Sequence, residues 1–288
     1  MLKIALPNKG SLSSPAMDML VEAGYRRRRD DRQLVMVDEA NDVEFFFLRP
    51  RDVAVYVGSS QVDVGITGRD LALDSGTAAV EHLALGFARS TFRYAAPTGT
   101  VTRVADIAGK RVASSYPGLV RLHLAGEGIT PTAVVRLDGA VESSVQLGVA
   151  DVVADVVETG STLKAAGLEV FGEPILRSEA VLLRRPVGVA GGDGDTEAAI
   201  AVLTRRLQGV LTARRYVLLD YVVSTASLEA AVAVAPGFES PTISSLVEDG
   251  WSAVRVMIER ATLNCTMDAL YEVGARGILA TQILASRL

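Results

Sequence analysis

Residues 142–163 read ESSVQLGVADVVADVVETGSTL. The middle of this stretch, Val149–Val157, is apolar except for Asp151 and Asp155, which is typical of a strand buried on both faces of a parallel sheet. A glycine and several hydroxyl side chains follow, and then a short helical pattern begins at Leu163. The order strand, turn, helix suits a phosphate group, because the N–H groups of the turn and of the helix start point at the anion.

The same turn admits a plainer interpretation. Ser161 or Thr162 can be an ordinary helix N-cap, and Gly160 an ordinary turn residue. Asp155 favours the ligand-binding interpretation, because a carboxylate at the carboxyl end of a buried strand can accept hydrogen bonds from the vicinal hydroxyls of a ribose. We therefore predict that this stretch binds a phosphate and its sugar.

Composition bounds the class of protein. The chain has 288 residues, of which 49% are hydrophobic, enough for two or three packed domains. A net charge of −5 and a pI near 5.2 argue against nucleic acid as the main partner. The one concentrated basic run, 26–29, is followed by two aspartates, and we interpret it mainly as a solvated turn.

Residue usage also bears on location and chemistry. The single cysteine, Cys265, excludes an intramolecular disulfide. The opening run 1–6 reads as a strand rather than a signal segment, and no apolar run is long enough to cross a bilayer, so we predict a cytoplasmic protein with no membrane partner. With only His82 and His123, a histidine-rich metal site and a Ser-His-Asp triad are both disfavoured.

Further candidate contacts follow the predicted strands 2–6, 42–48 and 62–66. Open α/β sheets bind ligands at the carboxyl ends of their strands, and a guanidinium fork matches paired phosphate oxygens. A solvated surface lysine is an equally good interpretation of Lys9. The candidates at these three strand ends are Lys9, Gly10, Ser11, Arg49, Arg51, Gly68 and Asp70.

The pattern of elements predicts an α/β protein with three parts. Two α/β lobes joined by crossing segments give the bilobal plan of periplasmic-binding-protein folds, with lobe I formed by 1–91 and 180–214 and lobe II by 92–179. Residues 215–288 read as strand, helix, strand, strand, helix, strand, which is the ferredoxin-like order. This last part carries no concentration of histidines or acids suited to chemistry, so we predict a regulatory or assembly role for it.

The segments PNKG, LRPRD, GITGRD, SYP and ESPTI, together with the stretch 142–163, resemble the long form of ATP phosphoribosyltransferase, the first enzyme of histidine biosynthesis. The family's motif over 142–163 is matched by Glu142, Gly148, Ala150, Val153, Asp155, Val156, Thr159, Gly160, Thr162 and Leu163. One departure is Ser11, since many members have an arginine there; Lys9, Arg49 or Arg51 can cover the lost charge.

The resemblance implies transfer of the phosphoribosyl group of 5-phosphoribosyl 1-diphosphate (PRPP) to N1 of the adenine of ATP, which gives N1-(5-phosphoribosyl)-ATP and pyrophosphate. It also implies Mg²⁺ held without dedicated protein ligands, feedback inhibition by L-histidine at the third domain, and a hexamer built from dimers. The expected PRPP-binding residues are Glu142, Asp155, Val156, Glu158, Thr159, Gly160, Ser161, Thr162 and Leu163. The expected ATP- or pyrophosphate-binding residues are Lys9, Gly10, Ser11, Arg49, Arg51, Gly68, Asp70 and Tyr116. Asp220, Phe238 and Thr242 are expected to bind histidine.

Two other functions stay open at this point. A non-catalytic, two-lobed binding protein for a small anion would share the architecture, and release of pyrophosphate from ATP and PRPP separates it from the enzyme. Prephenate dehydratase also joins a bilobal part to a C-terminal βαββαβ unit, but its Thr-Arg-Phe tripeptide is absent from this chain.

Overall fold

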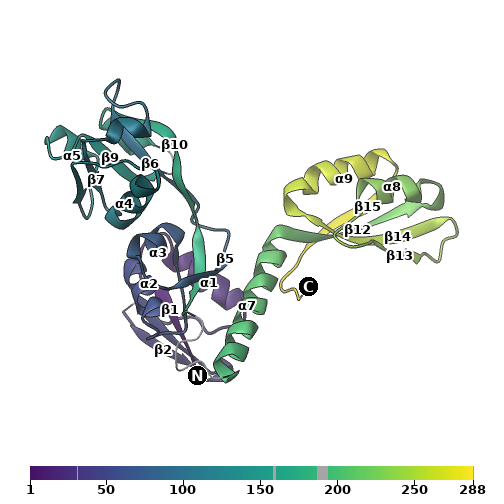
Figure 1. The fold of residues 1–288 in the computed structure, drawn as a ribbon. Coiled ribbons are helices and arrows are strands. Elements are labelled where there is room, and N and C mark those ends of the chain that lie inside the picture. Colours follow the sequence, from purple (N-terminus) through teal and green to yellow (C-terminus); the bar gives the residue numbers. More distant parts are fainter. Residues whose placement is uncertain (31, 158–159, 187–193, 288) are drawn as a thin grey trace. The chain divides into compact units, whose positions relative to one another are not determined.

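The computed structural model describes residues 1–30, 32–157, 160–186 and 194–287 (Figure 1). Its strands form a six-stranded, a five-stranded and a four-stranded sheet. Contacts divide the chain into two compact units, Met1–Asp18 with Tyr25–Ile200 and Met19–Gly24 with Ala201–Leu288. The first unit contains both larger sheets, and the second contains the four-stranded sheet.

The six-stranded sheet has the strand order β2-β3-β1-β4-β11-β5. Its strands are β1 (Leu2–Pro7), β2 (Val35–Asp38), β3 (Val43–Leu48), β4 (Val64–Gly68), β5 (Val80–Ala84) and β11 (Ala180–Arg184). β1 runs parallel to β3 and β4, and β11 runs antiparallel to β4. The helical segments between these strands are α1 (Ser13–Glu22), the 3₁₀ turn Glu39–Asn41, α2 (Pro50–Gly58) and α3 (Arg69–Ser75). The loops that follow β1, β3 and β4 therefore meet at one edge of the sheet.

The five-stranded sheet has the order β10-β6-β9-β7-β8. Its strands are β6 (Ser90–Pro97), β7 (Arg111–Ser114), β8 (Ala133–Arg136), β9 (Val152–Val157) and β10 (Leu168–Ser178). The helical segments are the 3₁₀ turn Val104–Ile107, α4 (Pro117–Gly126), α5 (Ser143–Gln146) and α6 (Ser161–Ala165). The apolar run of the sequence motif is the central strand β9, which is parallel to β7 and antiparallel to β6.

Three local differences from the sequence prediction have physical causes. The sequence pattern predicts a helix over 104–110, but the structure has only the short 3₁₀ turn Val104–Ile107, because Gly109 adopts the left-handed conformation with φ +71° and prevents the helix from continuing. The strands β5 and β10 were missed altogether. β10 changes register between Phe171 and Leu176, which breaks the alternation by which a strand is read from sequence. β5 is largely exposed and carries no buried face to mark it.

Two crossing segments join the larger sheets. The chain passes from β5 to β6 through residues 85–89, and from β10 back to β11 through residue 179. Two α/β sheets connected in this way confirm the predicted bilobal plan. The boundaries proposed at 91/92 and 179/180 stay a prediction, since contacts group both sheets into one unit.

The second unit contains the predicted βαββαβ order. Its elements are β12 (Tyr216–Ser224), the 3₁₀ turn Thr225–Ser227, α8 (Leu228–Val234), β13 (Thr242–Ser245), β14 (Trp251–Glu259), the 3₁₀ turn Arg260–Thr262, α9 (Leu263–Glu272) and β15 (Arg276–Gln282). The strand order is β13-β14-β12-β15, and alternate residues of β12 are buried, as in a sheet with one covered face. Contacts divide the preceding helix α7 (Gly194–Arg215) at residue 200, upstream of the expected boundary at 214/215.

Candidate active site

Asp155 lies on the central strand β9, where the sequence motif predicted a ribose contact. Its Oδ1 accepts the N–H of Val156 at 2.8 Å. Burial raises the pKa of the Asp155 carboxyl above its ordinary value, the Val156 N–H lowers it, and the negative charge of Glu142 raises it further. Glu142, which immediately precedes α5, is thus near enough to act on Asp155. Each of the two carboxylates can accept a hydrogen bond from a sugar hydroxyl.

The turn after β9 is described from Gly160 onward, and the predicted contacts Glu158 and Thr159 lie outside the described residues. Gly160 adopts φ +75°, a left-handed conformation that favours glycine, and α6 follows it directly. Leu163 is buried in a core cluster with Ala113 and Val153, which anchors the short helix to the sheet. The Ser161 and Thr162 side chains are exposed.

One cavity collects residues from both predicted substrate sets. We call it the Tyr116 cavity; its volume is about 230 Å³. Its lining includes six of the predicted ATP- or pyrophosphate-side residues together with Val156 of β9. These residues are Lys9, Gly10, Ser11, Gly68, Asp70, Tyr116 and Val156. Arg49 and Arg51 are not in the lining.

Asp70 is held in the Tyr116 cavity by backbone geometry. Its side chain is 7% exposed, its Oδ1 accepts the N–H of Leu71 at 2.9 Å, and its own N–H donates to Ser178 Oγ at 3.1 Å. A Cβ on Gly68 would lie 2.2 Å from that Oδ1. The glycine at position 68 is therefore what allows the carboxylate to fold back over the end of β4.

Tyr116 presents a protonated phenol to the same cavity. Burial raises the pKa of Tyr116, and the negative charge of Asp70 raises it further. The ring packs edge to face on Phe92, with centroids 5.2 Å apart, and the guanidinium carbon of Arg51 lies 5.0 Å from the ring centroid. Because the phenol stays protonated at neutral pH, it is available as a hydrogen-bond donor to a ligand.

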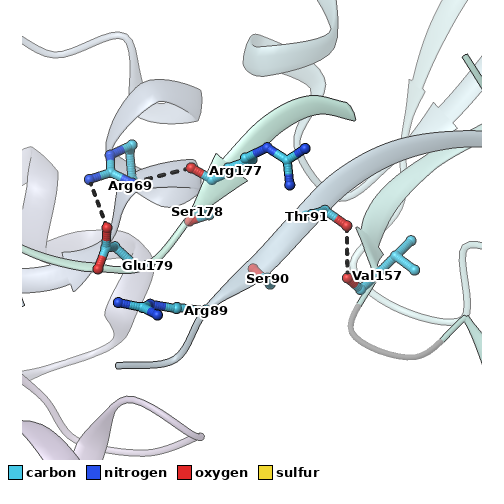
Figure 2. Close-up of a pocket in the computed structure, with 8 residues that line it drawn as sticks. All are labelled: Arg69, Arg89, Ser90, Thr91, Val157, Arg177, Ser178 and Glu179. Atoms are coloured by element: carbon cyan, nitrogen blue, oxygen red, sulfur yellow. Dashed lines mark hydrogen bonds and ion pairs between the residues drawn. The ribbon is translucent and has the colours of Figure 1, made fainter. Parts of the chain in front are cut away.

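A second cavity adjoins the Tyr116 cavity, and Ser90 and Ser178 line both (Figure 2). Its volume is about 490 Å³. It lies against β6, β9 and β10, beside the crossing segments that join the two larger sheets.

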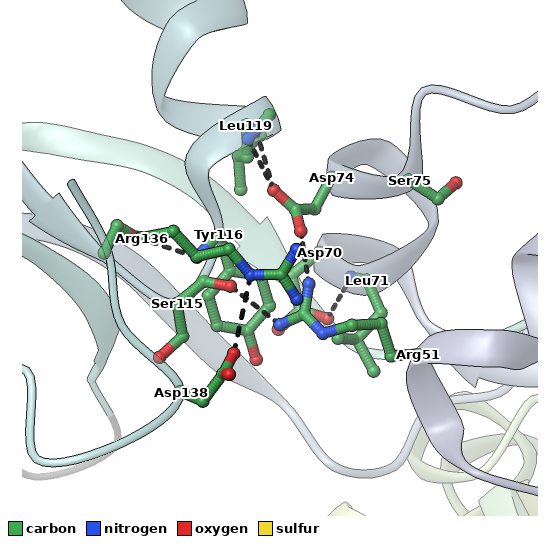
Figure 3. Close-up of polar contacts among 12 residues, drawn as sticks. Arg51, Asp70, Leu71, Asp74, Ser75, Ser115, Tyr116, Leu119, Arg136 and Asp138 are labelled. Atoms are coloured by element: carbon green, nitrogen blue, oxygen red, sulfur yellow. Dashed lines mark hydrogen bonds and ion pairs between the residues drawn. The ribbon is translucent and has the colours of Figure 1, made fainter. Parts of the chain in front are cut away.

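The sequence prediction missed Asp74, which links the two larger sheets through α3 and α4 (Figure 3). Its Oδ1 accepts the N–H of Gly118 at 2.8 Å and of Leu119 at 3.1 Å, at the start of α4. Its Oδ2 forms an ion pair with Arg51, which also donates to the carbonyl oxygen of Ser115 at 2.8 Å. The Asp74 side chain is only 6% exposed. No local signal marks Asp74, because its partners lie at least 23 residues away along the chain.

Because of these contacts, the Arg51 guanidinium is already bound within the protein and is not free to bind a phosphate. The two outer nitrogens of the guanidinium are occupied by Asp74 and by the Ser115 carbonyl. Arg49 immediately precedes α2 and its side chain is exposed. The predicted phosphate role of both arginines stays a prediction, and the geometry favours Arg49.

The residues expected to bind histidine divide between two cavities of the second unit. Asp220 and Thr242 line a cavity of about 370 Å³, where Asp220 Oδ1 accepts a hydrogen bond from Arg255 Nε at 2.7 Å. Phe238 lines a different cavity of about 360 Å³ and packs edge to face on Tyr216, with centroids 5.3 Å apart. One small ligand in one of these cavities would not contact all three residues.

The fold and site together define a two-lobed α/β protein with a polar ligand cavity, extended by a ferredoxin-like unit. The ATP phosphoribosyltransferase family matches residues 49–209, and the HisG C-terminal domain matches residues 213–285. The chain therefore belongs to the ATP phosphoribosyltransferase family.

Relatives named ATP phosphoribosyltransferase extend over the whole chain. The protein of Arthrobacter sp. (strain FB24) is 61% identical and that of Streptomyces coelicolor is 57% identical, each over 100% of both chains. Among solved structures, a chain of the ATP phosphoribosyl transferase (HisG:HisZ) complex from Thermotoga maritima is similar, with a TM-score of 0.62 and 27% identity over 73% of this chain and 98% of that one. Among the described helices, none combines the length and apolar character that a bilayer crossing needs.

Proposed function

We propose that Glu142, Asp155 and the turn around Gly160–Leu163 bind PRPP, and that the Tyr116 cavity takes the adenine side of ATP. The chain is an ATP phosphoribosyltransferase: it transfers the phosphoribosyl group of PRPP to N1 of the adenine of ATP and releases pyrophosphate. The observation that carries the assignment of residues is the shared cavity, in which Val156 of β9 lies with Lys9 and Asp70. The function is tested by incubating the protein with ATP and PRPP and measuring the release of pyrophosphate, which should require both substrates. If no pyrophosphate is released when both are present, the small-anion binding protein becomes the better interpretation.

The reaction is a substitution at C1 of the ribose. The lone pair of adenine N1 forms the new N–C1 bond, and the C1–O bond breaks with its electron pair leaving on pyrophosphate. N1 carries its lone pair already, so holding it against C1 supplies much of the acceleration without a general base. Glu142 and Asp155 accept hydrogen bonds from the ribose hydroxyls, and charge-assisted bonds of this kind contribute about 1.5–3 kcal/mol each.

Magnesium is part of the proposal, with substrate oxygens and water as its main ligands. When bound, it would neutralise the charge of the leaving pyrophosphate. Within the described ranges, no three histidine, cysteine or carboxylate side chains are grouped as a metal site would need. The carboxylates present, Asp155 and Glu142, fit a role toward the ribose, so we derive no step through the ion.

Thr162 offers a test of the phosphate-binding turn. The Thr162→Val substitution should raise the Kd for PRPP by a factor that corresponds to about 1–3 kcal/mol, because it removes one hydroxyl donor without changing the shape of the side chain. The fold should survive, since Thr162 is exposed. Isothermal titration with PRPP measures the effect, and Thr98→Val, an exposed threonine of a different turn, is the matched control. An unchanged affinity would remove Thr162 from the phosphate site.

We also propose that L-histidine inhibits the enzyme through the second unit and that the chain assembles into dimers and hexamers. The family resemblance motivates both. The cavity of Asp220 is the better histidine site, because a carboxylate beside a guanidinium can meet both the amino and the carboxylate group of an amino acid. Exposed large apolar side chains on the second unit, such as Ile243 and Leu279, support contact with further copies. A cytoplasmic location stays a prediction.

Measuring inhibition by histidine in variants of the two cavities of the second unit shows which of them binds histidine. Asp220→Asn should raise the histidine concentration needed for half inhibition of pyrophosphate release about tenfold or more, because a charge-assisted bond to the amino group is lost. Phe238→Leu, in the other cavity, should leave that concentration within about twofold, since a side chain outside the binding cavity contributes little binding energy. The reverse pattern would move the histidine site to the cavity of Phe238.

A further inference from the structure

The second cavity of the first unit (Figure 2) is lined by none of the residues that were predicted to contact a substrate. We call it the Arg89 cavity. Its lining comes from α3, from β6, β9 and β10, and from residues beside these elements. The lining residues are Arg69, Arg89, Ser90, Thr91, Val157, Arg177, Ser178 and Glu179.

One of its three arginines is already neutralised. Arg69 donates to both carboxylate oxygens of Glu81, at 2.8 and 2.7 Å, and reaches Glu179 at 3.5 Å. It also donates to the main-chain carbonyl oxygen of Arg177 at 3.2 Å. Glu179 in turn accepts the N–H of Gly86 at 3.0 Å. The carboxylates near the cavity are therefore engaged with Arg69 and the backbone.

The other two arginines are not neutralised. Arg89 and Arg177 are exposed, and neither guanidinium has a hydrogen bond or an ion pair to any residue within the described ranges. Figure 2 draws Arg89 at one side of the cavity and Arg177 at the other, with Ser90 between them. Each guanidinium has about five N–H donors. The two arginines together therefore suit a ligand that carries several anionic oxygens.

The strand register places this cavity next to the proposed ribose site. Arg177 pairs with Thr91 across β10 and β6, and Thr91 pairs with Val157 across β6 and β9. Residues paired in this way project from the same face of a sheet. Asp155, two residues before Val157, projects from that same face, at a distance along the strand of about 7 Å. The phosphates attached to a ribose that is bound at Asp155 can therefore reach toward Arg177.

We propose that the Arg89 cavity is a polyphosphate subsite, in which Arg89 and Arg177 hold the diphosphate of PRPP or the triphosphate of ATP. The inference rests on the proposed function and deepens it. A single carboxylate or monophosphate would use one guanidinium, whereas a diphosphate or longer chain supplies oxygens for both. The diphosphate of PRPP and the triphosphate of ATP both have this chemistry. They can be told apart by removing the arginines and measuring whether PRPP or the ATP analogue binds more weakly.

The test is titration calorimetry on the full chain with magnesium present. The probes are inorganic pyrophosphate, PRPP, a non-hydrolysable triphosphate analogue of ATP, and AMP. The Arg89→Gln/Arg177→Gln double variant should raise the Kd for pyrophosphate about tenfold or more, because two charge-assisted contacts are lost. The Arg205→Gln variant, which removes an exposed arginine of α7 outside the cavity lining, is the control and should change that Kd by less than about twofold, because a solvent-screened charge that does not contact the ligand contributes little.

Each outcome decides the point. A loss of pyrophosphate affinity confined to the double variant supports the subsite, and the substrate that weakens in parallel, PRPP or the ATP analogue, is the source of the polyphosphate. Pyrophosphate affinity that is unchanged in the double variant, or lowered equally by Arg205→Gln, overturns it. Failure of the proposed function would show separately, as absence of pyrophosphate release from ATP and PRPP by the unsubstituted chain, since the binding measurement does not require turnover.

Discussion

Asp155→Asn should lower kcat roughly a hundredfold or more while leaving the free energy of unfolding unchanged or higher. The turnover effect follows from the lost negative charge of a carboxylate that accepts ribose hydrogen bonds, a loss of about 3 kcal/mol, with about 1.4 kcal/mol for each factor of ten in rate. Steady-state kinetics and chemical denaturation of the same preparations measure the two effects.

The stability effect has the opposite sign to that of an ordinary ion pair. Burial raises the pKa of Asp155 above its value in the unfolded chain, so the folded state disfavours the ionised form. The stability that this group contributes is complete below the unfolded pKa and is lost as the pH rises through the folded pKa. At neutral pH the ionised Asp155 therefore costs stability, and a neutral asparagine removes that cost. A carboxylate kept at a cost to stability is typical of a functional site.

Asp151 provides a matched control on the same stretch of chain. Hydrogen bonds from Arg111 lower the pKa of Asp151 to about 2, and its two oxygens accept from the Arg111 backbone and guanidinium at 2.8–3.1 Å. Its contribution to stability is present above the unfolded pKa and is lost as the pH falls through the folded pKa. Asp151→Asn should thus lower stability at neutral pH with kcat kept. If Asp155→Asn also unfolds the protein more easily and keeps its turnover, Asp155 is a structural residue.

Asp74→Ala should lower the free energy of unfolding by about 2–4 kcal/mol, because it leaves the N–H groups of Gly118 and Leu119 and the Arg51 guanidinium without their acceptor. The same change should lower kcat/KM for ATP at least about tenfold, a loss of roughly 1.4 kcal/mol, because Arg51 packs over Tyr116 in the substrate cavity. Urea denaturation and initial rates over a range of ATP concentrations measure both. An unchanged kcat/KM would mean that Asp74 holds the sheets together without positioning the site.

Three further variants separate the contribution of the Asp74 charge, of its ion pair with Arg51, and of an ordinary surface ion pair. Asp74→Asn keeps an oxygen acceptor for the α4 N–H groups but loses the charge, so it should recover part of the lost stability. A double-mutant cycle with Arg51→Ala isolates the energy of the ion pair itself. Asp18→Ala breaks the exposed Asp18–Arg27 pair and should cost less than about 1 kcal/mol, as surface pairs do. Equal losses from Asp18→Ala and Asp74→Ala would contradict the link between the sheets.

Local chemistry explains which parts of the site were predictable. The β9 strand, the left-handed Gly160 and the anchor Leu163 are read from a continuous apolar run, a glycine and the first apolar residue of the helix, all within a dozen residues. The βαββαβ unit is read in the same way, because alternate residues of β12 face its core. Where alternation fails, as at the register shift of β10, the prediction failed too.

The sequence by itself determined the α/β class, the strand and turn that carry Asp155, the order of elements in the C-terminal unit, and the family. Only the tertiary structure decided that Arg51 pairs with Asp74 and that Tyr116, Asp70 and Val156 line one cavity. The physical reason is the separation of these partners along the chain. Periodicity, caps and turn residues act over a few positions, whereas the contact of Asp74 with Gly118 exists only where α3 and α4, which belong to different sheets, pack together.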